Sequence, residues 1–364
     1  MDNSFFSDLI NGRLNPVSTL DISRGGKALV ISDFHMGGGR RDDLAQNGAL
    51  LLQMLESYYL KGGWNIILNG DIEELQRFSL ESIRKQWPGL YELFDAFNAR
   101  GALYKTLGNH DEQLIFEKKY PYPLCEAVQV KTGLLPVYVY HGHQSSSVYT
   151  KYNTVIRLAL RYLLRPLGVR NISSGRSPYR RFHVEKQAYD FSRTHNCISI
   201  IGHTHRALFE SLGRFEYIKF EIERLCRDYP ESQGEERERI AEEVRALRRD
   251  LGKLKRSEKR SAMRQSLYGD DLPVPCLFNS GSAIGRRGIN AIELDREKIA
   301  LAYWFVQGQG KKFVSRGRYP VYILPGTRYC RTVLNQDKFS YIKARIELLG
   351  NSAEINPKGL RGPD

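Results

Sequence analysis

Short apolar runs that end in polar residues constrain the fold of this chain more than any other feature. The early runs are residues 28–31, 66–68, 102–104, 137–140 and 198–201, and later ones are 276–278, 292–294 and 299–304. Continuous apolar runs of this length suit strands that are buried on both faces. Helical patterns lie between the early runs, over residues 44–59 and 80–98. Because strands and helices alternate, the sequence predicts an α/β fold built in layers.

Clusters of Asp, His and Asn follow five of these runs. They are Asp33-Phe34-His35, Gly70-Asp71, Gly108-Asn109-His110-Asp111, His141-Gly142-His143 and Gly202-His203-Thr204-His205. Imidazole, carboxylate and amide groups without a thiolate suit divalent metals such as Mn, Fe, Zn or Ni. Glycine before a ligand lets the backbone turn sharply and approach closely. Since open α/β sheets form their sites at the carboxyl ends of strands, the clusters predict one shared metal centre.

The ordered series of clusters resembles the signature of the calcineurin-like metallophosphoesterases. The series D-x-H, G-D, G-N-H-D, H-G-H, G-H-T-H covers residues 33–205, and FNSGS at residues 278–282 resembles the strand and turn that follow in many members. The resemblance implies an α/β fold of two packed mixed β-sheets flanked by helices, here with helical insertions. It also implies two divalent metal ions, with Mn as the first candidate and Fe, Zn or Ni as the others.

The resemblance assigns a ligand set to each metal. One metal would be held by Asp33, His35, Asp71 and His205, and the other by Asp71, Asn109, His141 and His203, so that Asp71 bridges them. His110 and Asp111 are the catalytic candidates. His110 would lie over the phosphate and protonate the leaving alkoxide, while the Asp111 carboxylate fixes its tautomer. His143 is a candidate for substrate binding, because His141 directly ends the strand and is the better ligand.

Two details compare the chain with branches of that superfamily. The sequences GDIEEL and GNHD differ from the phosphoprotein phosphatases, which have an Arg-rich continuation after G-D and a G-N-H-E motif. GDIEEL, followed later by a basic insertion, is more similar to the UDP-diacylglucosamine pyrophosphatases of lipid A synthesis. The commonest of those enzymes have Arg where this chain has His110, so their substrate is not carried over directly.

Two segments interrupt what we expect to be a single metallophosphoesterase domain over residues 1–350. Residues 144–194 hold an apolar helix pattern with Arg157, Arg161 and Arg165 four residues apart. They leave and return beside ligand motifs, so we expect an inserted basic helical lid with Arg157 and Arg161 as substrate candidates; the alternative is a solvated helix face. Residues 212–270 space their apolar positions by 4 and 3, which predicts an inserted helical hairpin for packing or oligomerisation. Residues 351–364 are expected to form a flexible tail.

The charge balance favours anionic partners without choosing among them. Lys and Arg total 55 against 41 for Asp and Glu, which gives a net charge of +14. Such a surface suits a phosphate-containing small molecule, a lipid-linked substrate at an anionic membrane, or nucleic acid. Five scattered cysteines form no C-x-x-C pair, and the sequence contains no signal peptide or membrane-length apolar run. We therefore expect a cytoplasmic protein that could contact a membrane peripherally.

The first functional hypothesis is a dinuclear metal-dependent phosphoesterase. It would hydrolyse a phosphodiester or pyrophosphate bond of a small-molecule or lipid-linked nucleotide, using hydroxide that the metals activate. A metal-dependent nuclease and a phosphomonoesterase are the alternatives, although no aromatic and basic stacking platform marks a nucleic-acid channel. A non-catalytic scaffold of the same fold ranks last, because every expected ligand is present.

Overall fold

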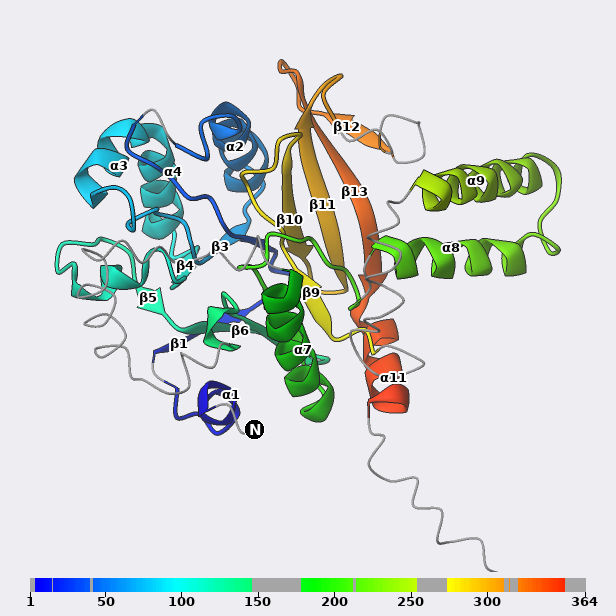
Figure 1. The fold of residues 1–364 in the computed structure, drawn as a ribbon, viewed down its shortest axis with the longest axis horizontal. Coiled ribbons are helices and arrows are strands. Elements are labelled where there is room, and N and C mark those ends of the chain that lie inside the picture. The colour runs from blue at the N-terminus through cyan, green and yellow to red at the C-terminus, as the bar shows by residue number, and fades with distance from the viewer. Residues whose placement is uncertain are drawn as a thin grey trace, which may run out of the picture.

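Two β-sheets packed face to face organise the chain, with helices on their outer faces (Figure 1). The computed structural model describes residues 4–14, 16–39, 42–145, 178–211, 214–253, 274–310, 314 and 320–350. The predicted α/β architecture of two mixed sheets flanked by helices is confirmed. Each early apolar run predicted as a strand lies in or overlaps a strand of one of these sheets.

The larger sheet has eight strands and carries three of the five clusters. Its order is β12 (Val321–Ile323), β13 (Tyr329–Lys338), β11 (Lys298–Val306), β10 (Ile289–Leu294), β2 (Ala28–Ile31), β3 (Asn65–Asn69), β4 (Leu103–Thr106) and β5 (Leu124–Cys125). Strands β2 to β5 run parallel, whereas β10 to β13 pair antiparallel. The parallel strands β2, β3 and β4 therefore present their carboxyl ends at the same edge.

The smaller sheet has five strands and carries the other two clusters. Its order is β1 (Val17–Asp21), β6 (Ala127–Lys131), β7 (Pro136–Val139), β8 (Ile198–Ile201) and β9 (Leu277–Asn279). Only the β6–β7 pair is antiparallel. The carboxyl ends of β7, β8 and β9 thus lie together, and the ligand motifs follow β7 and β8.

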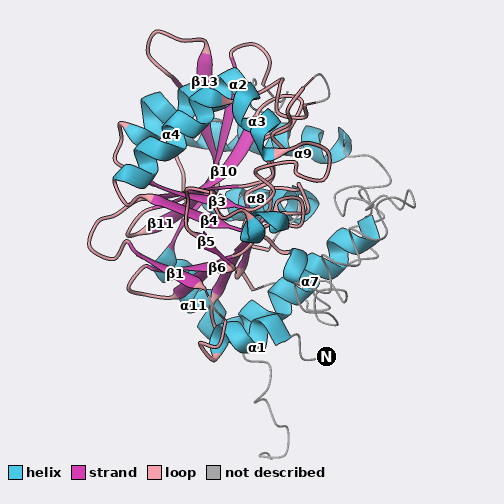
Figure 2. Ribbon diagram, turned by 90° about the vertical axis from the view of Figure 1, so that its left-hand side faces the viewer, coloured by secondary structure: helices cyan, strands magenta, loops and turns pink. Residues whose placement is uncertain are grey.

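Burial on both faces explains why the strands are continuous apolar runs. In β2, Ala28 and Val30 belong to the core between the sheets, whereas Leu29 and Ile31 belong to the core under the helices on the outer face. That outer face is covered by α2 (Gly48–Met54), the π-helix η1 (Leu55–Leu60), α3 (Leu80–Gln86) and α4 (Pro88–Ala99). The other core is completed by α1 (Ser4–Ile10), α7 (Pro178–Thr194) and α11 (Phe339–Leu349) (Figure 2).

Two helices project from the sheets beside β13 (Figure 1). They are α8 (Arg214–Asp228) and α9 (Gly234–Lys253). They pack on each other through a separate apolar cluster of Ile218, Leu225, Ile240 and Leu247, flanked by Ile222, Val244 and Leu251. These residues have the spacing of 4 and 3 from which the hairpin was predicted. Residues 254–270 of that segment lie outside the described residues.

The segment predicted to form a lid is described only at its two ends. The first end is the short 3₁₀ helix η3 (His143–Ser145), and the second is α7, which packs on β8 and β9. Arg157, Arg161 and Arg165 lie outside the described residues, as does the predicted tail over 351–364.

Candidate metal centre

The two sheets are joined where their ligand-bearing strands end. The Asn69 side-chain amide donates a hydrogen bond to the Tyr140 carbonyl at 3.0 Å, which links the ends of β3 and β7. The Ser32 and Ser280 hydroxyl oxygens lie 2.8 Å apart and link the ends of β2 and β9. The loops after β2, β3, β4, β7 and β8 therefore meet at one edge of the sandwich.

Carboxylate and imidazole atoms from these loops form three overlapping groups. Within each group the candidate ligand atoms lie within 4.8 Å of one another; the groups are Asp33–His35–His205, His35–Asp71–His110 and Asp71–His141–His203. Asp71 belongs to two of them. Its Oδ2 lies 3.2 Å from Nε2 of His141 and 3.9 Å from Nε2 of His35. A carboxylate between two sets of imidazoles is the arrangement that a bridging ligand requires.

The backbone of these loops adopts an unusual conformation at the ligand positions. Five of the seven predicted metal ligands have φ between 47° and 62°, in the left-handed region; they are Asp33, His35, Asp71, His203 and His205. For residues other than glycine this conformation is strained, and strained backbone is concentrated at functional sites. The turns aim side chains from two sheets at one point, which an extended strand end would not do.

Two glycines permit the close approach of these loops, as predicted from the motifs. A Cβ atom on Gly108 would lie 2.2 Å from Oδ1 of Asp71, and one on Gly202 would lie 2.8 Å from Oδ2 of Asp33. Any side chain at either position would displace a predicted ligand. The glycines before Asn109 and His203 are therefore needed for contact between loops.

The orientation of the buried polar groups fits a divalent cation. Nδ1 of His141 lies 2.9 Å from the Asn69 carbonyl and donates to it, so Nε2 is the nitrogen that a metal would bind once it has lost its proton. Among the described residues, that Nε2 and Oδ1 of Asn109 are both buried without a hydrogen-bond partner. Because buried polar atoms are normally satisfied, two predicted ligands left in this way fit a bound cation. The donor set, with oxygen and imidazole but no thiolate, suits Mn, Fe, Zn or Ni.

The electrostatics of the group hold Asp71 ionised. Burial alone would raise the pKa of the Asp71 carboxyl, but His141 and His110 outweigh it and hold the pKa well below its usual range. Burial lowers and Asp71 raises the pKa of His141, with a net value of about 9. Burial and the neighbouring His141 lower the pKa of His203 to about 3. The cluster therefore combines a charged imidazole, a neutral one and buried carboxylates.

A carboxylate that was not predicted orients His110. Oε2 of Glu74 lies 2.8 Å from Nδ1 of His110 and 3.0 Å from Nδ1 of His35, and the Glu74 side chain is buried. The two imidazoles thus share one acceptor, which leaves Nε2 of each directed elsewhere. The only sequence signal was the second acidic residue of GDIEEL, three positions after Asp71.

The prediction that Asp111 orients His110 is wrong. The Asp111 carboxylate accepts from the backbone N–H of Gly108 at 2.7 Å and of Ile72 at 2.9 Å, and pairs with Lys105 Nζ at 3.0 Å. These three donors occupy both oxygens. Asp111 therefore acts on the loops and not on the imidazole beside it in the sequence.

His143 lies beside the second group of ligands. It is buried in η3, and its ring centroid is 5.5 Å from that of His141 and 6.3 Å from that of His203. It belongs to none of the three groups of ligand atoms. The other two candidates for substrate binding, Arg157 and Arg161, fall outside the described part of the chain.

The second end of the predicted lid, α7, is hydrogen-bonded to the loop after β8, which carries two predicted metal ligands. Glu185 on α7 is buried and accepts a hydrogen bond from the Thr204 hydroxyl at 2.9 Å. Thr204 lies between His203 and His205, and the Arg206 guanidinium also pairs with Glu185. The segment that returns from the insertion thus helps to hold the loop after β8.

His110 and His205 are more exposed than the other imidazoles of the cluster. The side chains of His110 and His205 are 15% and 22% exposed, whereas those of His35, Asp71 and His141 are between 0% and 5% exposed.

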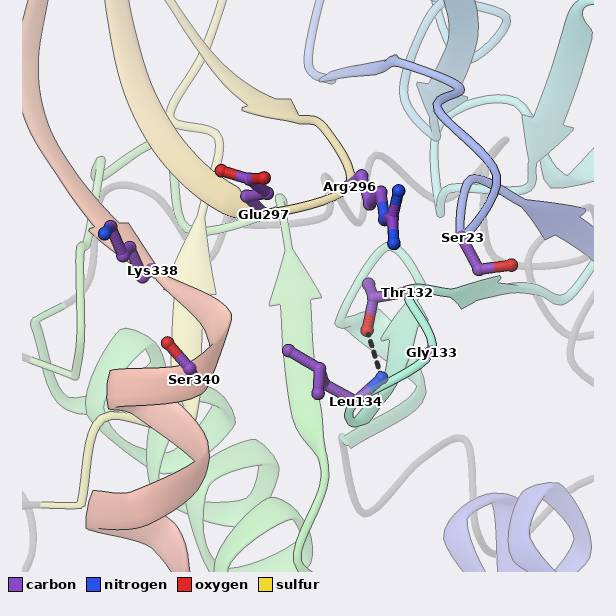
Figure 3. Close-up of a pocket in the computed structure, with 8 residues that line it drawn as sticks. All are labelled: Ser23, Thr132, Gly133, Leu134, Arg296, Glu297, Lys338 and Ser340. Carbon is purple, nitrogen blue, oxygen red and sulfur yellow. Dashed lines mark hydrogen bonds between the residues drawn. The ribbon is translucent and has the colours of Figure 1, made fainter.

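A separate hollow of about 470 Å³ does not belong to this site. It is lined by Ser23, Thr132, Gly133, Leu134, Arg296, Glu297, Lys338 and Ser340 (Figure 3). Ser23 precedes β2 and Thr132 precedes β7, so the hollow lies at the opposite end of the strands from the ligands. Thr132 Oγ1 accepts from the N–H of Leu134 in its own turn, and the polar side chains do not converge on one point.

Comparisons with known proteins identify distant structural neighbours only. No family model matches this chain, and no curated protein matches it. Within the described residues, no helix is both long enough and apolar enough to cross a membrane.

Three solved structures are similar to this chain at low identity. YfcE, a phosphoesterase from E. coli, is 12% identical with a TM-score of 0.32 over 75% of this chain and 91% of that one. A conserved protein of Streptococcus pneumoniae, described as a predicted phosphoesterase, is 11% identical with a TM-score of 0.28 over 77% and 90%. A single-residue variant of Vps29 from Entamoeba histolytica is 12% identical with a TM-score of 0.31 over 86% and 99%. Because all these values are low, we base the functional assignment on the side chains of the site.

Proposed function

We propose that this chain is a dinuclear metal-dependent phosphoesterase of the calcineurin-like superfamily, which hydrolyses a phosphodiester or pyrophosphate bond. One observation carries the proposal: Oδ2 of Asp71 lies 3.2 Å from Nε2 of His141 and 3.9 Å from Nε2 of His35, which belong to the two different ligand sets. The motif order that resembles the superfamily supports the same conclusion independently of the geometry.

The proposed ligands divide into two sets that share Asp71. Asp33, His35 and His205 would hold one ion with Asp71, and Asn109, His141 and His203 would hold the other. Two bound divalent ions supply Lewis acidity for the phosphoryl oxygens and lower the pKa of a bound water. We take Mn as the first candidate, with Fe, Zn or Ni as alternatives.

His110 is the proposed general acid. Burial lowers its pKa, but Asp71 and Glu74 raise it by more, so its net pKa lies above the ordinary value for histidine. With Nδ1–H donated to Glu74, the second proton is carried on Nε2. That proton can be given to the leaving oxygen, which a poor leaving group requires more than a good one does.

The substrate that we favour is a small-molecule or lipid-linked nucleotide. The net charge of +14 suits an anionic compound. The similarity of GDIEEL and the basic insertion to the UDP-diacylglucosamine pyrophosphatases supports a nucleotide–lipid pyrophosphate, while His110 in place of Arg distinguishes this chain from the commonest of them.

Metal analysis and a substrate panel test the proposal. Protein purified without chelator should contain two equivalents of divalent metal per chain. With Mn²⁺ present, it should hydrolyse nucleotide-sugar pyrophosphates or aryl diesters faster than aryl monoesters or single- and double-stranded DNA. Preference for DNA would favour a nuclease, and preference for monoesters would favour a phosphomonoesterase.

Two variants complete this test. Asp71→Ala should lose both metals and activity, because it removes the shared ligand. Asp190→Ala removes the same side chain from the surface of α7, where Asp190 is half exposed and pairs with Lys186, and it should match the wild type. Full activity in Asp71→Ala would overturn the assignment.

A further inference from the structure

Lys105 is a buried cation next to the metal centre that the proposed chemistry does not use. It lies on β4, three residues before Gly108, and its side chain is 0% exposed. Burying an ammonium group is costly unless it is paired and hydrogen-bonded. The partners of Lys105 therefore indicate what the charge stabilises.

Lys105 pairs with one carboxylate from each of two ligand-bearing loops. Its Nζ lies 2.8 Å from Oε2 of Glu73, in the loop after β3, and 3.0 Å from Oδ2 of Asp111, in the loop after β4. Glu73 also accepts from the hydroxyls of Tyr91 at 3.2 Å and Tyr120 at 2.7 Å. One buried cation thus neutralises charge from both loops, and hydrogen bonds satisfy the remaining acceptor positions.

The carboxylate of Asp111, which pairs with Lys105, also binds the backbone beside two of the predicted ligands. It accepts from the N–H of Ile72, the neighbour of Asp71, and from the N–H of Gly108, the neighbour of Asn109. The loops are also joined directly, because the His110 N–H donates to Oδ1 of Asp71 at 2.8 Å. If the Asp111 carboxylate moves, its link between Ile72 and Gly108 is lost, and the His110–Asp71 hydrogen bond alone no longer fixes the separation of Asp71 and Asn109.

We propose that Lys105 is a positioning residue that fixes Asp71 and Asn109 relative to each other through Asp111 and Glu73. The inference rests on the proposed function, because it gives both ligands a role in the same metal site. Lys105 touches no ligand side chain in this account and acts only through the two carboxylates.

Metal binding by Lys105→Met tests the proposal. Methionine keeps most of the length of the side chain and removes its charge. Calorimetric titration of chelator-treated protein with Mn²⁺ should show the dissociation constant of the weaker site raised by about 10- to 100-fold, as for other residues that support ligands. A purely structural role would instead lower the number of sites per chain as folded protein is lost, with the dissociation constant unchanged. That result would overturn the proposal.

A matched control removes another buried ion pair from the same sheet. Arg331 on β13 pairs with Glu293, their side chains are 15% and 6% exposed, and four strands separate β13 from β4. Arg331→Met should lower the thermal midpoint as Lys105→Met does but leave the Mn²⁺ affinity at the wild-type value. An equal loss of Mn²⁺ affinity in both variants would show a general effect of instability and overturn the specific role.

A milder variant applies if Lys105→Met does not fold. Asp111→Asn keeps the shape of the side chain, but its single amide oxygen cannot replace both carboxylate oxygens, of which Oδ1 accepts from the Gly108 N–H and Oδ2 from the Ile72 N–H and Lys105. It should raise the same Mn²⁺ dissociation constant, and an unchanged value would overturn the proposal. Because Mn²⁺ affinity is read without a substrate, inactivity of the wild-type protein on the whole panel would count against the proposed function alone.

Discussion

Oε2 of Glu74 lies 2.8 Å from Nδ1 of His110, so a buried carboxylate fixes the ring of a partly exposed histidine in the metal centre. Burial alone would raise the pKa of the Glu74 carboxyl, but hydrogen bonds from His110 and His35 lower it to about 2. Glu74 is therefore ionised at neutral pH. It favours protonated His110 and sets which nitrogen of that ring carries the free proton.

Glu74→Gln should impair the step that protonates the leaving group. The amide keeps the shape of the carboxylate but loses the charge that raises the pKa of His110. A lost general acid lowers the rate by about 10² to 10⁴-fold, and we expect kcat to fall toward the lower end of that range. Hydrolysis of a p-nitrophenyl diester should fall less than that of a phenyl diester.

Glu56→Gln, on the exposed face of η1, is the control. Equal losses for the two leaving groups would contradict this role.

Metal binding should release a proton from His141. The pKa of His141 is about 9 in the metal-free protein, above its ordinary value of 6.5. The protonated ring therefore contributes stability that is fully present below pH 6.5 and is lost as the pH rises through 9. A metal competes with that proton, so Mn²⁺ affinity should rise with pH across the same window. Calorimetry at pH 7.5 in buffers of different ionisation enthalpy measures the release.

His141→Asn isolates the contribution of this ring. The variant should release one proton fewer than the wild type when Mn²⁺ binds. His203 is not expected to contribute, because its pKa of about 3 leaves it neutral at pH 7.5. The same proton count in wild type and variant would refute the assignment to His141.

The sequence predicts the position of the site better than the contacts within it. Runs such as residues 28–31 and 198–201 are apolar on both faces, and parallel strands bring their carboxyl ends together. The placement of Asp33 and Asp71 at one edge of the larger sheet follows from those two rules, and so does that of His203 at the edge of the smaller sheet. Their left-handed backbone conformation does not follow from these rules, because a strained conformation persists only where the packing of neighbouring loops holds it.

Pairings between side chains depend on distances that the sequence does not contain. The resemblance pairs Asp111 with His110, its neighbour in the sequence, but in the structure Asp111 faces Lys105. Glu73 and Glu74 look equivalent in GDIEEL. In the structure Glu73 pairs with Lys105 and Glu74 with His110, which only the fold determines.

Residues 212–273 should be replaceable without loss of the site. The residues that flank them are already joined, because the Ser211 hydroxyl donates to the Val274 carbonyl at 2.6 Å and accepts from the Leu277 N–H at 3.0 Å. A short Gly-Ser linker can therefore close the gap, and the cluster that joins α8 to α9 is separate from the two main cores. Metal content and turnover of an aryl diester should stay within about twofold, since surface loops tolerate large changes in length. Loss of both would show that this segment builds the centre. Sedimentation of the deletion variant also tests whether the hairpin mediates oligomerisation.

The final prediction concerns Arg157, Arg161 and Arg165 in the predicted lid. The insertion leaves the core at His143 in η3 and returns through α7, where Glu185 binds the Thr204 hydroxyl between two ligands. Both ends therefore lie beside the metal centre, and guanidinium groups bind phosphate oxygens well. Reversal of the three charges to Glu should raise KM for a nucleotide–lipid pyrophosphate by at least about 10-fold, since each lost charged contact costs more than about 1 kcal/mol. A small aryl diester should be hydrolysed as before, and less of the variant should sediment with anionic liposomes.

The matched control reverses Arg245, Arg248 and Arg249, which are exposed on α9. If both triple variants raise KM equally, net charge explains the effect and the insertion has no specific role in substrate binding.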